Sequence, residues 1–266
     1  VEMKTQQQLS FWQIQTPYTS NESLQKDIKV DIAIVGGGFT GLSTAIHILE
    51  KSPSLSVALI ESESIGFGAS GRNGGFSMTL FGLSLELTAL RFGKENAVFA
   101  HQYMVSAVNH LESLLTKYNI DCDYERNGFL KVATYPDYVK RLEKEFQLIQ
   151  SLGLKGFSWL SKNEIQKQVN SANYHAAIFE ECCAILDPAK LAFGLKKTAE
   201  NLGAKIYEHT AALSIEKQKQ KYHIQTEKGL IKSDKVVFAT NAYSHLLKSL
   251  KYKQVPGFTR IVLTEP

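Results

Sequence analysis

The stretch from Asp31 to Glu61 leaves this chain few choices of fold, because four elements follow one another in it without interruption. The apolar strand DIAIV runs into three consecutive glycines, the helix TGLSTAIHILEK follows, and SVALIE forms a second apolar strand. A strand–helix–strand unit of this length needs a parallel sheet with a right-handed crossover. The sequence therefore predicts an α/β fold built around this unit.

The glycines of this unit are spaced as G-x-G-x-x-G, at Gly36, Gly38 and Gly41. The first glycine allows a tight turn, the second lets the backbone approach a diphosphate, and the third lets the helix pack closely on the strand. The free N–H groups and the positive dipole end of the helix favour an anion at the same place. The pattern predicts a dinucleotide-binding site.

Glu61 ends the second strand, twenty residues after Gly41. A carboxylate at this position can accept hydrogen bonds from the ribose hydroxyls of an adenosine, and it would repel the 2′-phosphate of NADP. The alternative interpretation is an exposed acid at a strand end. With the glycines in register, we interpret Glu61 as a ribose ligand.

NAD and FAD share this fingerprint, and a second glycine-rich stretch favours FAD. Residues 66–75, GFGASGRNGG, follow the second strand closely, and their backbone amides and small side chains could wrap a diphosphate and bring main chain against a flavin ring. An NAD-binding fold would usually proceed to another crossover helix. A flexible surface loop is the alternative. The later segment KVVFATNAY, a strand with small and polar residues after it, suits a strand end that touches the cofactor.

The rest of the chain predicts a Rossmann-like FAD-binding domain with an inserted, incomplete antiparallel α+β substrate domain. Helical periodicity runs from about Leu83 to Tyr118, and short apolar runs alternate with polar turns from Phe157 to Leu186. Asp187 and Pro188 start a helix that Gly203 closes. The predicted division is an N-terminal arm at 1–30, the FAD-binding domain at 31–127 and 187–250, and part of the substrate domain at 128–186 and 251–266.

Composition excludes several other classes of protein. The net charge of +4 comes without an aromatic-interleaved basic tract, which argues against a nucleic-acid partner. The seven histidines show no metal-ligand spacing, and three cysteines, two of them adjacent, suit buried thiols in a reducing compartment such as the cytoplasm. Residues 32–49 lack charge, but the glycines and His47 argue against a transmembrane segment.

With these motifs in view, the chain resembles the D-amino acid oxidase-like superfamily of FAD-dependent oxidoreductases, which includes the glycine oxidase and sarcosine oxidase types. The gamma-glutamylputrescine oxidase type looks nearest. The resemblance is carried by VDIAIVGGGFTGLSTAIHILE, ALIES, IGFGASGRNGGF, LDPAKLAFGLKKTAENLGAKIYEHT and VVFATNAY, which span residues 30 to 243. Members of the family continue well past the point where this chain stops, so the substrate domain is truncated relative to them.

The resemblance implies a set of cofactor-binding residues. It assigns the diphosphate to Gly36, Gly38, Phe39, Thr40 and Gly41, the adenosine to Glu61 and Ser62, and the flavin side to Ser70, Arg72, Asn73, Gly74 and Gly75. It assigns the adenine to the backbone of Ala212, where valine is more typical, and a late cofactor contact to Ala239, Thr240 and Asn241. Arg72 is the one candidate for a catalytic charge beside the flavin ring, with a phosphate or surface ion pair as its alternative role.

The resemblance also implies a reaction. A hydride passes from the carbon that bears the amine to flavin N5, water hydrolyses the resulting imine, and oxygen or a quinone takes the electrons. Three alternatives stay open: a non-catalytic FAD-binding subunit or fragment of a larger assembly, which a second chain completes; an NAD-dependent dehydrogenase; and a flavin domain of an RNA-modifying enzyme, against which the weak net charge argues.

Overall fold

The computed structural model describes residues 9–243 and seven isolated positions beyond them, Leu246, Leu247, Lys253, Gln254, Gly257, Ile261 and Thr264. Contacts between its residues divide the chain into two units. Unit 1 comprises Val1–Gly74, Ile120–Cys122 and Asp187–Pro266, and unit 2 comprises Gly75–Asn119 and Asp123–Leu186. Each unit is described by itself.

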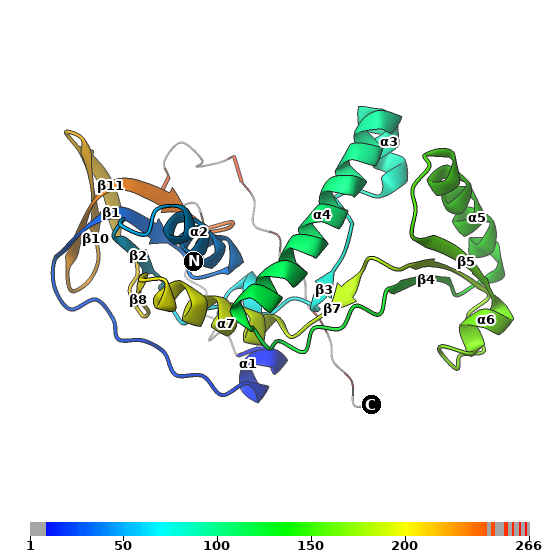
Figure 1. Cartoon of the computed structure of the whole chain (residues 1–266), viewed down its shortest axis with the longest axis horizontal. Helices are drawn as coiled ribbons and strands as arrows, with labels where there is room; N and C mark the ends of the chain where they lie inside the picture. Colours follow the sequence, from blue (N-terminus) through cyan, green and yellow to red (C-terminus); the bar gives the residue numbers. More distant parts are fainter. Residues whose placement is uncertain are drawn as a thin grey trace. The chain divides into compact units, whose positions relative to one another are not determined.

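Unit 1 is built on a six-stranded sheet with the order β8-β2-β1-β11-β10-β9 (Figure 1). The strands are β1 (Ile28–Val35), β2 (Val57–Ile60), β8 (Lys205–Tyr207), β9 (Ser214–Gln218), β10 (Lys221–Gln225) and β11 (Leu230–Phe238). The first four strands of this order run parallel, and β10 and β9 add an antiparallel hairpin. The parallel sheet predicted from the strand–helix–strand unit is confirmed.

Three helices lie in the described part of this unit. They are α1 (Phe11–Gln15), α2 (Phe39–Lys51) and α7 (Pro188–Asn201), and a short 3-10 turn, η1, spans Ala69–Gly71. The predicted start of α7 is confirmed, because Asp187 caps the helix by accepting hydrogen bonds from the amides of Ala189 and Lys190. Helices α2 and α7 pack against each other, and α2 also contacts β1 and β2.

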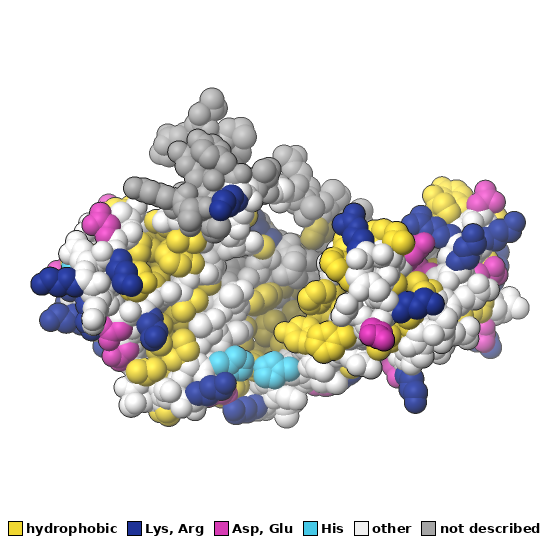
Figure 2. Space-filling view, turned by 90° about the horizontal axis from the view of Figure 1, so that it is seen from above, with side chains coloured by type: hydrophobic (Ala, Val, Ile, Leu, Met, Phe, Trp, Pro, Cys, Tyr) yellow, Lys and Arg dark blue, Asp and Glu magenta, His cyan; other side chains and the backbone are white. Residues whose placement is uncertain are grey.

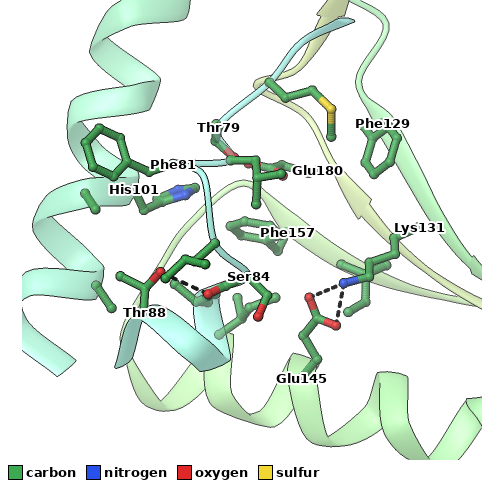
Figure 3. Close-up of a pocket in the computed structure, with 18 residues that line it drawn as sticks. Thr79, Phe81, Ser84, Thr88, His101, Phe129, Lys131, Glu145, Phe157 and Glu180 are labelled. Atoms are coloured by element: carbon green, nitrogen blue, oxygen red, sulfur yellow. Dashed lines mark hydrogen bonds and ion pairs between the residues drawn. The ribbon is translucent and has the colours of Figure 1, made fainter. Parts of the chain in front are cut away.

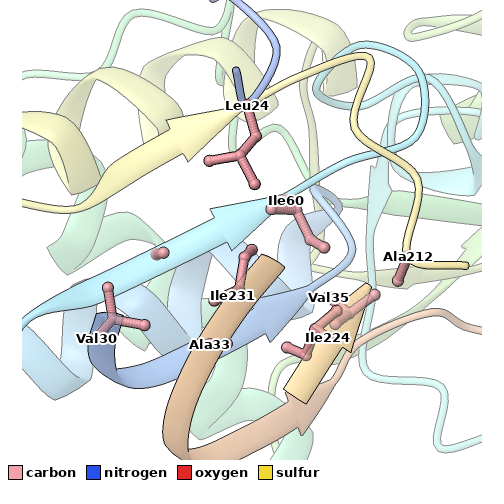
Figure 4. Close-up of a cluster of buried hydrophobic side chains, with 9 residues drawn as sticks. Leu24, Val30, Ala33, Val35, Ile60, Ala212, Ile224 and Ile231 are labelled. Carbon is pink, nitrogen blue, oxygen red and sulfur yellow. The ribbon is translucent and has the colours of Figure 1, made fainter. Parts of the chain in front are cut away.

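One hydrophobic core of unit 1 lies on the sheet (Figure 4). Its buried members include Leu24, Ala33, Ile60, Ile224 and Ile231. Leu24 precedes the first strand, and the others come from β1, β2, β10 and β11. Burial of these side chains joins the parallel strands to the hairpin, which stiffens the sheet edge where the strands end.

Unit 2 combines helices with short antiparallel strands. The helices are α3 (Leu85–Phe92), α4 (Lys94–Tyr118), α5 (Pro136–Ser151) and α6 (Lys162–Gln166), and the strands are β3 (Phe76–Ser77), β4 (Phe129–Ala133), β5 (Phe157–Ser161), β6 (Ala176–Glu180) and β7 (Ala184–Ile185). Strands β4 and β5 flank β6, and β3 pairs with β7, all antiparallel. This pairing confirms the antiparallel arrangement predicted for the segment from Phe157 to Leu186.

Two local features of unit 2 differ from the sequence prediction. The helical stretch that begins near Leu83 is broken at Gly93, whose φ of 88° ends α3 before α4 begins. Helix α6 was not predicted, although Ser161 and Glu164 form a capping box, which is a recognisable start signal.

The contact units differ from the predicted domain boundaries. The prediction placed residues 31–127 in the FAD-binding domain, whereas most of residues 75–127 pack within unit 2. The structure describes only five positions of the predicted segment 251–266. The division into an FAD-binding and a substrate domain stays a prediction.

Surface and composition add two observations. Lysine and arginine side chains on the face seen in Figure 2 are interspersed with acidic ones and form no continuous stripe among the described residues. Within the described part of the chain, no helix is both long enough and apolar enough to cross a bilayer, and no group of three or more His, Cys, Asp or Glu residues could hold a metal ion.

Candidate cofactor-binding site

The first glycine turn joins the ends of two parallel strands. Gly36 has a φ of +116° and donates from its amide to the carbonyl of Ile60 at 2.9 Å. A Cβ built on Gly36 would lie 2.4 Å from the carbonyl oxygen of Ala239 and 3.4 Å from the amide of Thr240. The structure thus brings two predicted segments together, the turn after β1 and the residues after β11.

The start of α2 is packed too tightly for side chains. A Cβ on Gly41 would lie 2.0 Å from the carbonyl oxygen of Gly36, and one on Gly38 would lie 2.8 Å from the hydroxyl of Ser70. Gly38 is the N-cap and has no side chain to cap the helix, but the Ser70 hydroxyl accepts a hydrogen bond from the amide of Phe39 at 3.0 Å. The positive end of the helix dipole therefore meets the second glycine-rich loop.

Glu61 lies beside this turn, as predicted from its place at the end of β2. One carboxylate oxygen accepts a hydrogen bond from the amide of Gly37 at 2.6 Å, and the other accepts from the Ser62 hydroxyl and the Glu63 amide, both at 3.0 Å. The carbonyl of Glu61 accepts from the amide of Thr210 at 2.7 Å. The carboxylate is only partly buried, so it retains acceptor capacity for a ligand hydroxyl.

Ala212, the residue whose backbone is predicted to contact the adenine, lies close to Thr210. Ala212 lies two residues further along the chain and is 9% exposed, in the hydrophobic core of unit 1. The amide of the next residue, Leu213, donates to the carbonyl of Gln225 at 2.8 Å, which fixes the local backbone. Contact between this backbone and an adenine stays a prediction.

The second glycine-rich loop is anchored on the first. The amide of Gly66 donates to the carbonyl of Gly37 at 3.1 Å, and the Asn73 side chain donates to the carbonyls of Ala69 and Ser70, both at 3.1 Å. A Cβ on Gly71 would lie 2.3 Å from the carbonyl oxygen of Gly66. Residues 66–73 are therefore a compact folded turn rather than the flexible surface loop that was the alternative interpretation.

Arg72 is held inside this turn. Its Nε donates to the carbonyl of Phe67 at 2.6 Å, and its guanidinium carbon lies 4.7 Å from the centroid of the Phe67 ring. Burial lowers the pKa of Arg72 from its ordinary value, and the charge of Tyr243 opposes that shift. The structure places the guanidinium of Arg72 within the second glycine-rich loop, beside Phe67. Contact between this guanidinium and a flavin ring stays a prediction.

Four remaining predicted residues lie at the turn after β11 and at the end of the second glycine-rich loop. Asn241 has a φ of +51° and, with Thr240, forms the turn after β11, where the Thr240 carbonyl accepts from the amide of Tyr243. Gly75 belongs to unit 2, where its carbonyl accepts from the amide of Leu186 at 2.9 Å. Gly74 ends the first segment of unit 1 and Gly75 begins unit 2, and contact of either glycine with a flavin stays a prediction.

The N-terminal arm packs on this site through hydrogen bonds that the sequence did not reveal. The hydroxyl of Ser10 donates to the carbonyl of Gly71 at 2.6 Å, the Trp12 indole donates to the carbonyl of Asn73 at 2.9 Å, and the Gln13 amide donates to the carbonyl of Gly66 at 3.0 Å. Ser10 and Gln13 also form the capping box of α1. The sequence signals for this packing are the capping box and an aromatic cluster, Phe11, Trp12 and Tyr18, which predicts an arm or lid on the domain that follows.

A second unpredicted feature is a buried ionic cluster beneath the loop. Glu208 is 0% exposed and accepts hydrogen bonds from the Tyr18 hydroxyl, the Lys196 ammonium and the amides of Asn21 and Ile65, at 2.6 to 2.8 Å. Burial alone would raise the pKa of Glu208, but these four donors outweigh it and hold the pKa below its ordinary value. The cluster ties the arm, α7 and the start of the second loop together.

These residues fit an extended dinucleotide cofactor. Cβ atoms on Gly36 or Gly41 would collide with backbone oxygens, so these two positions of the turn require glycine, whereas one on Gly38 would displace only the Ser70 hydroxyl. The turn offers main-chain amides at a positive helix end, and Glu61 offers an acceptor at the end of the neighbouring strand. The arrangement can bind a diphosphate and a ribose side by side.

Comparison with known proteins gives the same result. A family model described as "DAO: FAD dependent oxidoreductase" matches residues 31–266. Gamma-glutamylputrescine oxidoreductase of Escherichia coli (strain K12) is 30% identical over 93% of this chain and 58% of its own length, and glycine oxidase of Bacillus subtilis (strain 168) is 24% identical over 80% and 54%. The crystal structure of glycine oxidase from Geobacillus kaustophilus superposes with a TM-score of 0.72 at 21% identity, over 83% of this chain and 58% of that one.

This chain covers only part of the length of its relatives. It spans little more than half the length of the curated relatives that it matches. The matched region begins at Asp31, the first residue of the predicted nucleotide-binding unit, and covers both glycine-rich stretches. The chain belongs to the DAO family of FAD-dependent oxidoreductases.

Proposed function

We propose that the protein containing this chain oxidises the C–N bond of an amine or an amino acid, with FAD as its cofactor. The observation that carries the proposal is the cradle formed by the glycine turn, Glu61 and the loop at 66–73, in a chain whose family match spans residues 31–266. Relatives named for gamma-glutamylputrescine and for glycine support an amine or an amino acid as the substrate class.

The residues of this chain would hold and orient the cofactor. The amides at the start of α2 would bind the diphosphate, and Glu61 would bind the adenosine ribose together with Ser62. Arg72, fixed by Phe67, would supply positive charge beside the flavin. Bound FAD supplies the acceptor for the hydride that leaves the carbon next to nitrogen, and water then converts the imine to a carbonyl compound and ammonia or a smaller amine.

Other parts of the proposal concern the whole protein. We infer that oxygen or a quinone takes the electrons, as the resemblance implies. We also propose a cytoplasmic location, because three cysteines, two of them adjacent, suit thiols in a reducing compartment, whereas oxidising compartments favour disulfides. Substrate-binding side chains would come in part from sequence beyond this chain, or from a second chain, because the match covers 58% of the Escherichia coli relative.

The substrate proposal is tested by anaerobic reduction of the bound flavin. The complete protein is mixed with a panel of primary amines, secondary amines and amino acids, and the flavin absorbance near 450 nm is followed. We expect bleaching by one class of these compounds and none by the matching alcohols. A flavin spectrum without bleaching by any amine would instead support an FAD-binding subunit without catalytic activity, and a colourless protein would contradict FAD binding itself.

Replacement of Glu61 by lysine is expected to weaken FAD retention about tenfold or more. The change removes an acceptor at the ribose and the hydrogen bond to the Gly37 amide, and a charged hydrogen bond contributes about 1.5–3 kcal/mol. Flavin released on dialysis is measured by its fluorescence. Glu63→Lys is the matched control. Glu63 is exposed, and its replacement by lysine changes the net charge of the protein as much as Glu61→Lys does. Equal retention in both variants would contradict the role of Glu61.

A further inference from the structure

Unit 2 contains a cavity of about 290 Å³ that the cofactor site does not use (Figure 3). It lies between α3 and α4, the sheet of β4, β5 and β6, and helix α5, and every lining residue belongs to unit 2. Leu85, Ala97, Ile149, Phe157 and Ile178 form much of its apolar wall. Its volume is near the lower end of the range for small-molecule sites, about 300–1,000 Å³.

One carboxylate marks the polar part of this cavity. Glu180 ends β6, and its Oε1 accepts a hydrogen bond from the hydroxyl of Thr79, which is only 9% exposed. Among the described residues, Glu180 forms no ion pair with a lysine or an arginine. Glu180 is half-buried and lies among apolar side chains of the lining, so it offers an ammonium group an acceptor that no lysine or arginine of the described chain occupies.

The other ionisable groups of the lining do not neutralise Glu180. The ammonium of Lys131 is already paired with Glu145 at 2.6 Å, as Figure 3 shows. Burial lowers the pKa of His101, and the charge of Glu180 opposes that shift only in part, so the imidazole is neutral at pH 7. Burial, with the charge of Glu180, raises the pKa of the adjacent Cys183 thiol to about 12. The cavity therefore carries one net negative charge.

The wall of the cavity suits a cation with an apolar body. Phe81, Phe129 and Phe157 all line it, and aromatic rings attract ammonium groups as well as alkyl chains. The hydroxyls of Thr79 and Thr88 already donate within the protein, to Glu180 and to the carbonyl of Ser84. Glu180 is thus the group best placed to accept hydrogen bonds from a ligand.

We propose that this cavity is a binding site for a protonated alkylamine, with the ammonium group on Glu180 and the alkyl chain against the phenylalanine and leucine wall. The site needs neither FAD nor oxidation of the ligand, so it stands apart from the proposed function. It would give unit 2 its own affinity for cationic amines.

The test uses hexylamine as the probe, with the complete protein at pH 7. The methyl resonance of Met78, a lining residue, is assigned with Met78→Leu and reports on this cavity. Titration is followed by methyl NMR of protein carrying ¹³C-methyl methionine. We expect hexylamine to shift this resonance and to bind at least tenfold more tightly than 1-hexanol, which has the same chain without the charge. Equal affinity of the two probes, or no shift at Met78, would overturn the proposal.

A pair of neighbouring variants locates the charge. Glu180→Gln keeps the size of the side chain and an acceptor for Thr79, and it should remove the tenfold preference for hexylamine. Glu181→Gln removes the next carboxylate, which is exposed and outside the lining, and it should leave the preference intact. A preference that survives in Glu180→Gln would show that the ammonium binds elsewhere. Should Glu180→Gln fail to fold, the comparison of the two probes on the unchanged protein still decides the matter.

Discussion

Replacement of Gly41 by alanine is expected to lower the free energy of unfolding by about 2 kcal/mol and to release FAD from the complete protein. Helix propensity alone predicts the opposite, because alanine is favoured over glycine inside a helix by about 1 kcal/mol. The added Cβ would lie 2.0 Å from the carbonyl oxygen of Gly36, and overpacking of this kind costs about 1–3 kcal/mol or more. The backbone of Gly36 cannot move away easily, because its amide donates a hydrogen bond to the carbonyl of Ile60.

Chemical denaturation and the flavin content after gel filtration measure the effect. Gly68→Ala is the control, because Gly68 lies in the second glycine-rich loop, has a negative φ of −74° and has no atom within 4 Å of an added Cβ. It should change stability far less than Gly41→Ala, because no neighbouring atom opposes the added Cβ. Similar losses in the two variants would mean that the contact with Gly36 is not the cause.

Replacement of Lys196 by methionine is expected to cost about 3–5 kcal/mol of stability, because it leaves the buried carboxylate of Glu208 without its cation. Lys196 is 6% exposed, and its ammonium lies 2.8 Å from the Glu208 carboxylate and 2.9 Å from the Tyr18 hydroxyl. Lys197→Met, at the exposed neighbouring position, should change stability little. Thermal unfolding compares the two variants. A Glu208→Gln change added to Lys196→Met should restore part of the loss, and failure of that rescue would contradict the ionic explanation.

The same cluster gives the fold a defined dependence on pH. Because the pKa of Glu208 is below its ordinary value in the folded state, its carboxylate adds stability at pH values above the unfolded pKa, which is about 4.3 for glutamate. That contribution disappears as the pH falls through the lower, folded-state pKa. In Lys196→Met the folded-state pKa rises, so acid unfolding should begin at a higher pH than in the unchanged protein.

The nucleotide-binding part of the fold was largely predictable, because each of its elements has a local cause. The apolar run of β1 predicts a buried strand, and the glycine spacing at Gly36, Gly38 and Gly41 predicts a turn in which two positions, Gly36 and Gly41, require glycine. Asp187 and Pro188 predict the start of α7 in the same local way. The family match to an FAD-dependent oxidoreductase confirms the choice of FAD that residues 66–75 suggested.

The unpredicted features of the cofactor site depend on partners distant in sequence. Ser70 caps α2 from 31 residues away, Trp12 reaches Asn73 across 61 residues, and Tyr18 reaches Glu208 across 190. A glutamate after a short strand looks like a surface residue until its donors are known. The helical character of residues 85–118 was predicted, but their place in unit 2 was not. Helical periodicity does not say which unit a helix packs against.

The position of β1 in the centre of its sheet has a consequence for the order of events during synthesis. Its neighbour on one side, β2, follows within 30 residues, but its neighbour on the other side, β11, is about 200 residues further along the chain. A growing polypeptide therefore carries an open strand edge until β11 has been synthesised, and such edges promote aggregation. Because Ala239 follows β11 and completes the glycine turn, coenzyme loading must wait until that late strand has left the ribosome and joined the sheet.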